Sequence, residues 1–282
     1  MNKAGKLFLK GLLKSFIGVT LLLGVTLISY HFVSRLFYIP EEEKTVSAGH
    51  TEGEEAIIRA SVDDISRNLI FCVDEQGEVR RLLLEVFHCE QGRLYYLTIP
   101  TETGITMSDS LYRRLILVNP SVPQLLKLSG ITEHFPKESA YAYGVLLVEE
   151  LLKIKMSYYT VMPAPTYDKI FQTEEPTETV GEAGEGKGQT IYPREIFSEG
   201  FISVIQHIRT EEELQRYIEE LYEEIESNLS LEDKMNYFDS YLKLAPARIT
   251  FELLAGEPKN SGYVPDGDKV AEQLARITGQ VR

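Results

Sequence analysis

A run of 20 uncharged residues near the N-terminus constrains this chain more than any other feature. The run reads SFIGVTLLLGVTLISYHFVS, covers residues 15–34 and lies between Lys14 and Arg35. As a helix with a rise of about 1.5 Å per residue it would be about 30 Å long, which matches the hydrocarbon thickness of a bilayer. We therefore predict a transmembrane signal anchor over residues 15–34.

The residues around this segment predict its orientation. Four lysines precede it, so the positive-inside rule places the N-terminus in the cytoplasm and the C-terminal body outside the membrane. A cleaved signal peptide is the first alternative, but its apolar region is normally shorter, and no small-x-small cleavage site follows Ile28. A buried helix is the second alternative, and such helices rarely lack charges over this length.

The body of the chain is strongly acidic. Residues 41–282 contain 24 lysines and arginines but 43 aspartates and glutamates, a net charge of −19. Nucleic-acid binding needs a cationic surface that neutralises phosphates, so this balance argues against a nucleic-acid partner. An exported location permits a disulfide between Cys72 and Cys89. Both cysteines occur in apolar runs, and we favour their interpretation as small buried hydrophobic residues.

Composition and periodicity divide the chain into four parts. A basic cytoplasmic tail (1–14) and the anchor are followed by an acidic stalk (35–65) and by an extracytoplasmic α/β domain (66–282). Within the domain, residues 172–190 read QTEEPTETVGEAGEGKGQT and have no apolar period. Such a stretch cannot repay its ordering entropy, so it predicts a flexible acidic loop.

Hydrophobic patterning predicts a sheet with helices packed on its faces. Apolar runs bounded by turn residues predict strands at RNLIFCVD, VRRLLLEVF and GRLYYLTIP. The segment ESAYAYGVLLVEELLKI has helical spacing and is followed by a strand, MSYYTVMP, which suggests a βαβ unit. Further helices are predicted at REIFSEGFISVIQHI and TEEELQRYIEELYEEIESN, the second with a capping box of Thr210 and Glu213. A helix (LEDKMNYFDSYLKL), a strand (ARITFELLAG) and a last helix (DKVAEQLARIT) complete the chain.

The chain lacks the familiar catalytic motifs. It contains no Gly-rich phosphate loop, G-x-S-x-G elbow or H-E-x-x-H sequence. Its five histidines are scattered, and none has metal-ligand spacing with a cysteine or another histidine. From the residues alone we infer an anchored α/β domain without a positive sign of catalysis.

The order of several segments resembles the LytR-CpsA-Psr family. The segments are NLIFCVDEQGEVRRLLLEVF, LYYLTIPTET and AYAYGVLLVEELLKIKMSYYTVM, followed by SVIQHIRTEEELQRYIEEL, which resembles the family's arginine-rich helical segment. ITFELLAGEPKNSGYVPDGDKVAEQLARI resembles its C-terminal strand, loop and helix, so the likeness runs from about residue 66 to 277. It implies a membrane-anchored protein of the bacterial envelope with a three-layer α/β/α fold, in which helices cover both faces of a central mixed sheet.

Charges at the positions that match the family's site are altered. Family members transfer glycan polymers from a polyprenyl-pyrophosphate carrier to peptidoglycan, which requires cations for the pyrophosphate and carboxylates for Mg²⁺ or a proton. The family's Arg-Ser-Asp turn falls on residues 78–80, which read Glu-Val-Arg, so both charges are inverted. Its Pro-Arg-Asp motif falls on residues 100–102, where Glu102 keeps a carboxylate but threonine replaces the arginine.

The arginine-rich segment changes in the same direction. The family's Arg-x-Arg pair falls on Gln206 and Ile208. Of the following Asp-x-x-Arg-x-x-Arg-Gln pattern, which falls on residues 213–220, only Arg216 remains an arginine. Each lost charge-assisted contact to a phosphate would weaken binding by about 1.5–3 kcal/mol. The resemblance therefore implies that pyrophosphate is repelled rather than attracted.

The leading hypothesis is a catalytically inactive protein that acts as a binding or scaffolding component in cell-envelope assembly. It would need no cofactor, would contact the membrane through residues 15–34, and would have a polyprenyl lipid or other envelope proteins as partners. Its predicted location is the bacterial cell membrane, with one span and the C-terminal domain outside.

The alternative hypothesis is a working phosphotransferase with a rebuilt site. Glu102 and Asp109 would then hold Mg²⁺, and Glu102 and Arg216 would take part in catalysis. The pyrophosphate would be bound by Arg80, Arg113 and Arg114. Arginine side chains that converge in one cleft would support this alternative, whereas arginines dispersed over the surface would argue against it.

Overall fold

A six-stranded mixed sheet forms the centre of the structure, a computed structural model that describes residues 59–174 and 193–279. All of these residues belong to one compact unit, residues 53–282. The strand order is β10 (Ile249–Leu253), β3 (Arg93–Thr98), β2 (Val79–His88), β1 (Ile65–Val73), β6 (Tyr158–Pro163) and β9 (Glu226–Ser227). The predicted anchor and most of the predicted acidic loop lie outside the described residues, and none of the helices described is long and apolar enough to cross a bilayer.

Four of the strands run in the same direction. β1 pairs in parallel with β6, and β3 pairs in parallel with β10, while β2 is antiparallel to both β1 and β3. The carboxyl ends of β1, β3, β6 and β10 therefore lie at one edge of the sheet, called here the carboxyl edge. Helix α4 (Ala140–Leu152) precedes β6, so the predicted succession of helix and parallel strand is confirmed.

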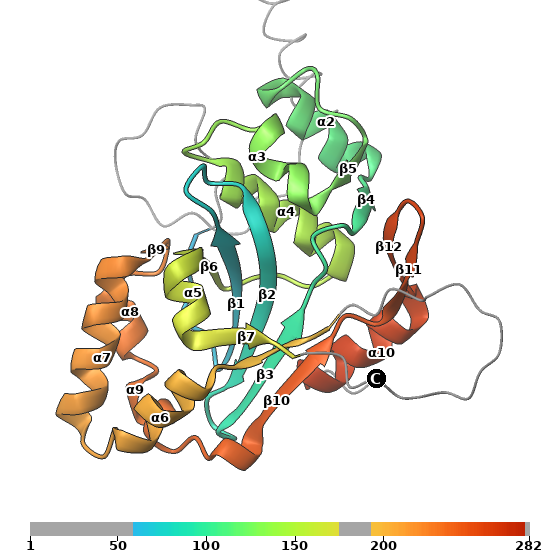
Figure 1. The fold of residues 1–282 in the computed structure, drawn as a ribbon. Coiled ribbons are helices and arrows are strands. Elements are labelled where there is room, and N and C mark those ends of the chain that lie inside the picture. Colours follow the sequence, from blue (N-terminus) through green and yellow to red (C-terminus); the bar gives the residue numbers. More distant parts are fainter. Residues whose placement is uncertain (1–58, 175–192, 280–282) are drawn as a thin grey trace, which may run out of the picture. The chain divides into compact units, whose positions relative to one another are not determined.

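Helices cover both faces of the sheet (Figure 1). Side chains alternate along β1, so Leu69 and Phe71 belong to the core on one face, and Ile70 and Cys72 to the core on the other. The first face carries α2 (Asp109–Val118), α3 (Ile131–His134), α4 and α10 (Gly267–Ile277). The second carries α5 (Ala164–Ile170), α6 (Glu199–His207), α7 (Glu211–Glu224), α8 (Leu231–Met235) and α9 (Phe238–Leu242). The predicted three-layer arrangement is confirmed.

Helix α4 lies close to β1 because a glycine faces the strand. A Cβ added at Gly144 would lie 3.1 Å from Cε1 and Cζ of Phe71 and 3.1 Å from Cδ1 of Ile131. The Phe71 side chain is fully buried, and its ring centroid lies 5.5 Å from that of Tyr141. The AYAYG segment thus begins helix α4, and the missing side chain of Gly144 leaves the space that the Phe71 ring needs.

A lysine whose side chain is only 13% exposed holds α8 and α9 against the opposite face. The Nζ of Lys234 donates hydrogen bonds to the hydroxyls of Tyr158 (2.7 Å) and Tyr241 (2.8 Å) and lies 3.9 Å from Oε1 of Glu85. Desolvation alone would lower the pKa of Lys234, but the hydroxyl of Tyr241 and the carboxylate of Glu85 outweigh it and raise that pKa. Lys234 therefore stays charged inside an apolar layer.

Helix α7 begins with the predicted capping box. The Oγ1 of Thr210 accepts a hydrogen bond from the backbone N–H of Glu213 (3.2 Å), and Oε2 of Glu213 accepts one from the backbone N–H of Thr210 (3.0 Å). Both backbone donors at the start of the helix are thereby satisfied by side chains.

Two helix predictions are wrong in their extent. The segment predicted as helical from residue 194 starts with β8 (Glu195–Phe197), which pairs with β7 (Phe171–Thr173), and α6 begins only after Ser198 caps it. The predicted helix at residues 231–244 is divided into α8 and α9. The backbone N–H groups of Asn236 and Tyr237 bond three residues back, to Asp233 and Lys234, and this tighter turn separates the two helices.

Two short antiparallel strand pairs were not predicted, of which the second is a hairpin. β4 (Gly104–Thr106) pairs with β5 (Leu125–Lys127), and β11 (Gly256–Lys259) pairs with β12 (Gly262–Pro265). The backbone N–H of Tyr263 donates to the carbonyl of Glu102 (3.2 Å), so this hairpin holds the loop that follows β3.

The two outer strands of the sheet have few backbone groups open to another strand. At one side, β9 has only two residues. At the other side, Nη1 of Arg194 donates to the carbonyl of Phe251 (3.0 Å), and Nε2 of Gln273 donates to the carbonyl of Leu253 (3.0 Å). Side chains thus occupy backbone acceptors of β10.

Candidate functional site

The carboxyl edge is where open α/β sheets place their ligands. The hairpin between β1 and β2 lies at this edge, and it carries Arg80, a predicted pyrophosphate ligand. Nη2 of Arg80 lies 2.5 Å from Oδ2 of Asp74 and 3.1 Å from Oε2 of Glu78. Desolvation disfavours the ionised form of Asp74, but the N–H of Glu78 and the guanidinium of Arg80 outweigh it and lower the pKa of Asp74. Arg80 is thus occupied by two carboxylates of its own hairpin.

A second ion pair at this edge was missed by the sequence analysis. Nη1 of Arg81 lies 2.9 Å from Oε1 of Glu195, whose side chain is only 4% exposed, and also contacts the hydroxyl of Thr173. The backbone N–H of Glu195 donates to Oγ1 of Thr98 (2.8 Å) at the end of β3. Glu195 joins β8 to the edge, and no sequence motif marks its pairing with an arginine more than 100 residues away.

Cys72 lies opposite Arg81 in the β1–β2 register. Burial raises the pKa of its thiol to about 12, so at neutral pH it is a neutral thiol and not a nucleophile. Both Cys72 and Cys89 are free, and the interpretation as a small buried residue is confirmed for Cys72, whereas Cys89 is partly exposed.

The predicted metal ligands are placed on separate elements. Oε2 of Glu102, in the loop after β3, accepts a hydrogen bond from Nζ of Lys127 on β5 (2.8 Å). Asp109 is the first residue of α2, and its Oδ1 accepts a hydrogen bond from Nε2 of Gln124 (3.3 Å). In the described part of the chain, no three His, Cys, Asp or Glu side chains are grouped so that they could hold a metal ion.

The predicted pyrophosphate-binding arginines do not share one element. Arg113 and Arg114 lie on the exposed side of α2, and neither forms a hydrogen bond or ion pair with a described residue. Arg216 lies on α7 and lines a hollow of about 480 Å³ together with Glu213 and Glu220. α2 and α7 lie at opposite ends of the domain (Figure 1).

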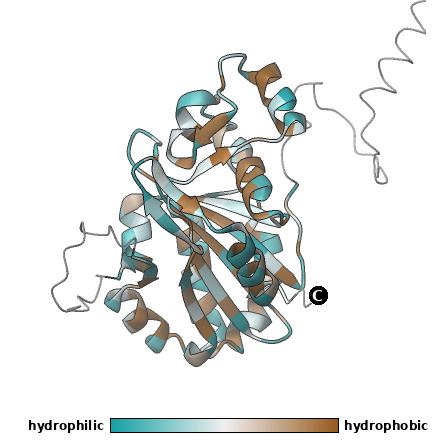
Figure 2. Cartoon of the chain, turned by 90° about the vertical axis from the view of Figure 1, so that its right-hand side faces the viewer, coloured by the Kyte–Doolittle hydropathy of each residue, from teal (hydrophilic) through white to brown (hydrophobic). Residues whose placement is uncertain are grey.

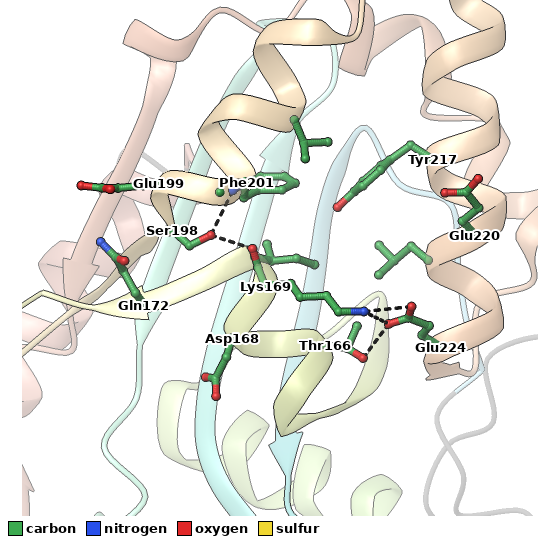
Figure 3. Close-up of a pocket in the computed structure, with 14 residues that line it drawn as sticks. Thr166, Asp168, Lys169, Gln172, Ser198, Glu199, Phe201, Tyr217, Glu220 and Glu224 are labelled. Atoms are coloured by element: carbon green, nitrogen blue, oxygen red, sulfur yellow. Dashed lines mark hydrogen bonds and ion pairs between the residues drawn. The ribbon is translucent and has the colours of Figure 1, made fainter.

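A hollow with a volume of about 610 Å³ lies between α5, α6 and α7. Phe201 of α6 and Tyr217 of α7 lie across it from each other, and Lys169 of α5 reaches toward Glu224 (Figure 3). Its apolar lining is formed by Ile170, Phe201, Val204 and Leu221. Its acidic lining is formed by Asp168, Glu199, Glu220 and Glu224, against the single base Lys169.

Several polar groups of this hollow contact one another. Nζ of Lys169 lies 3.0 Å from Oε2 of Glu224, which also accepts from Oγ1 of Thr166 (2.8 Å). These two donors lower the pKa of Glu224. The hydroxyl of Ser198 donates to the carbonyl of Lys169 (2.6 Å) and accepts from the N–H of Phe201, so it serves as a helix cap. Burial raises the pKa of Tyr217 to about 12. The lining therefore offers shape and charge but no activated nucleophile.

Comparison with known proteins gives structural matches only. No protein-family model matches the chain, and no curated protein matches it in sequence. The crystal structure of TagV from Bacillus subtilis is similar with a TM-score of 0.51 and 12% identity, over 77% of this chain and 98% of TagV.

Two structures of TagT are less similar. One, titled as the LytR-CPS2A-psr family protein YwtF (TagT) with bound octaprenyl pyrophosphate lipid, has a TM-score of 0.45 and 16% identity over 83% of this chain and 100% of that one. The other, TagT bound to LI-WTA, has a TM-score of 0.47 and 16% identity over the same shares. YwtF is a Bacillus subtilis protein. The match to TagV shows that the described domain has the fold of the LytR-CpsA-Psr proteins.

Proposed function

We propose that this chain is a non-catalytic binding component with a LytR-CpsA-Psr fold, anchored by residues 15–34 and working outside the bacterial membrane in cell-envelope assembly. The observation that carries the proposal is the pairing of cations at the carboxyl edge. Arg80, Arg81 and Lys127 each lie within 3 Å of a carboxylate oxygen of the same domain.

This pairing lowers the expected affinity of the carboxyl edge for pyrophosphate. A bound pyrophosphate needs cations whose charge is not already compensated. At this edge an incoming anion would also face the carboxylates of Asp74, Glu78 and Glu102, which repel it. The net effect of each pair on an approaching phosphate is therefore small or unfavourable.

The hollow between α5, α6 and α7 supports a binding role. Its volume of about 610 Å³ falls within the range of small-molecule sites, about 300–1,000 Å³. Its apolar lining gives contact area, and Lys169 and Glu224 are already paired with each other. A hollow with this volume and lining could bind a ligand without catalysing a reaction.

The proposal is tested with the polyprenyl pyrophosphate that the family resemblance implies. We expect the full chain in detergent to bind it equally well with and without Mg²⁺, because no free cations converge with metal-binding carboxylates in the described domain. The measurement is isothermal titration calorimetry with polyprenyl pyrophosphate and, in parallel, with a polyprenol of the same length. Equal affinity for the two lipids would mean that only the tail is recognised.

Arg216→Ala and Arg80→Ala are the matched variants for this measurement, and neither should change the affinity. Binding that requires Mg²⁺ and that Arg216→Ala abolishes would contradict the proposal. It would support the alternative, a phosphotransferase that moves glycan polymer to peptidoglycan from a rebuilt site.

A further inference from the structure

Exposed apolar residues are concentrated on and beside α2. Among the described residues, the two most exposed large hydrophobic side chains are Leu117 (85%) and Leu125 (64%), and Val118 is also exposed. Their side chains are therefore available for contact with an apolar partner outside the domain. Together with Arg113 and Arg114, these three residues are called here the α2 surface.

The local structure fixes these side chains in the solvent. Leu111 and Leu115 turn one side of α2 to the core, which leaves Arg113, Arg114 and Leu117 on the other side at helical spacing. Pleating of β5, which pairs with β4, buries Leu126 and turns Leu125 outward. The backbone N–H of Asn119 donates to the carbonyl of Leu115 at the end of α2. The Nδ2 of Asn119 donates to the carbonyl of His134 (2.7 Å), which attaches this end of α2 to α3.

The charge of this region differs from that of the rest of the chain. Residues 104–131 contain the basic side chains Arg113, Arg114 and Lys127, of which Lys127 is paired with Glu102, and the single acidic side chain Asp109, whereas residues 41–282 as a whole carry a net charge of −19. Arg113 and Arg114 form no ion pair with any described residue. Figure 2 shows apolar residues at the top of the domain, the height at which Figure 1 places α2.

We propose that the α2 surface lies against an anionic lipid bilayer, with Leu117 and Leu125 among the acyl chains and Arg113 and Arg114 at the headgroups. Arginine stems can cover apolar surface while their guanidinium groups contact phosphates, a pattern typical of interfacial helices. The contact rests on the proposed membrane location of the chain.

The predicted stalk is long enough for such a contact. β1 begins at Ile65 at the amino edge of the sheet, whereas α2 lies beyond the carboxyl edge (Figure 1). The longest strand, β2, has 10 residues and spans about 34 Å. Residues 35–58 could extend over about 80 Å, more than twice that length.

The chain contains no tryptophan, so a single indole can report on this contact. We place it with Leu117→Trp and, as a matched control, with Leu242→Trp on α9, where the leucine is 41% exposed. The full chain is reconstituted in vesicles of phosphatidylcholine and phosphatidylglycerol with or without brominated acyl chains. We expect the bromine to remove about half of the Leu117→Trp emission, because interfacial residues reach the acyl boundary, and little of the Leu242→Trp emission.

Arg113→Glu and Arg114→Glu, added together to Leu117→Trp, should reduce the quenching to the control level. Equal quenching of Leu117→Trp and Leu242→Trp would overturn the proposal, as would a Leu117→Trp indole that is not quenched. Flotation of the same vesicles separates this failure from failure of the proposed anchor. A folded chain that floats but has an unquenched indole would support the proposed anchor and contradict the α2 contact. A chain that neither floats nor shows quenching would contradict both.

Discussion

Lys234→Met is expected to lower the free energy of unfolding by about 3–5 kcal/mol, because it leaves the carboxylate of Glu85 buried without its cation. The Glu85 side chain is 10% exposed and keeps only the hydroxyl of Tyr96 as a hydrogen-bond donor in the described structure. Methionine fills a similar volume, so the loss reports on the charge and on the hydrogen bonds to Tyr158 and Tyr241. Urea unfolding followed by circular dichroism measures it.

Two variants make this result specific. Lys243→Met removes a lysine that is exposed at the end of α9 and should change the free energy of unfolding by no more than about 0.5 kcal/mol. Glu85→Gln added to Lys234→Met removes the stranded charge and should recover part of the loss. If Lys234→Met costs no more than Lys243→Met, the buried cluster does not stabilise the domain.

The same cluster predicts a loss of stability at alkaline pH. The pKa of Lys234 is raised in the folded domain, so its contribution is fully present below its unfolded pKa of about 10.4 and is lost as the pH rises toward the folded value. Burial raises the pKa of Tyr158 and Tyr241 as well, which adds to the loss in the same direction. We expect the free energy of unfolding to fall from about pH 10 upward. An unchanged value up to about pH 11.5 would contradict this assignment.

Phe71→Ala should lower the free energy of unfolding by about 3–5 kcal/mol, since it empties a fully buried position between β1 and α4. Gly144→Val should itself cost about 1–3 kcal/mol, because the added side chain meets the Phe71 ring and Ile131. The measurement is again urea unfolding.

The double variant distinguishes this packing from two independent losses. With the ring removed, the valine has space, so Phe71→Ala with Gly144→Val should lose less than the sum of the single losses. Additive losses would mean that Gly144 is needed for another reason. Val118→Ala, on the exposed side of the first layer, should change stability by no more than about 0.5 kcal/mol.

Local patterns were sufficient for much of the fold. The apolar runs of β1, β2, β3 and β6 and the helical spacing of α4 were found from sequence because their periods are long and uninterrupted. The capping box of α7 was also predicted, since Thr210 and Glu213 are three residues apart. β8, β11 and β12 were missed because three- and four-residue strands are specified by the hairpin partner and not by a period of their own.

The site was harder to predict because its pairs are distant in sequence. Arg81 and Glu195 meet only when β8 is placed beside the sheet, and Lys127 reaches Glu102 only through the pairing of β5 with β4. Lys234 was missed although a signal existed. Tyr237 and Tyr241 follow it at three and seven residues, a spacing that can place all three on one helical side.

The occupied carbonyls of β10 and the two-residue length of β9 have a consequence for the chain at high protein concentration. An open sheet edge is a template on which another chain can add a strand, the usual first step toward domain swapping or fibrils. Here Arg194 and Gln273 hold the acceptors that an incoming strand would need, and β9 offers too little length to pair with. The domain can therefore reach high local concentration without joining its sheet to that of a neighbour.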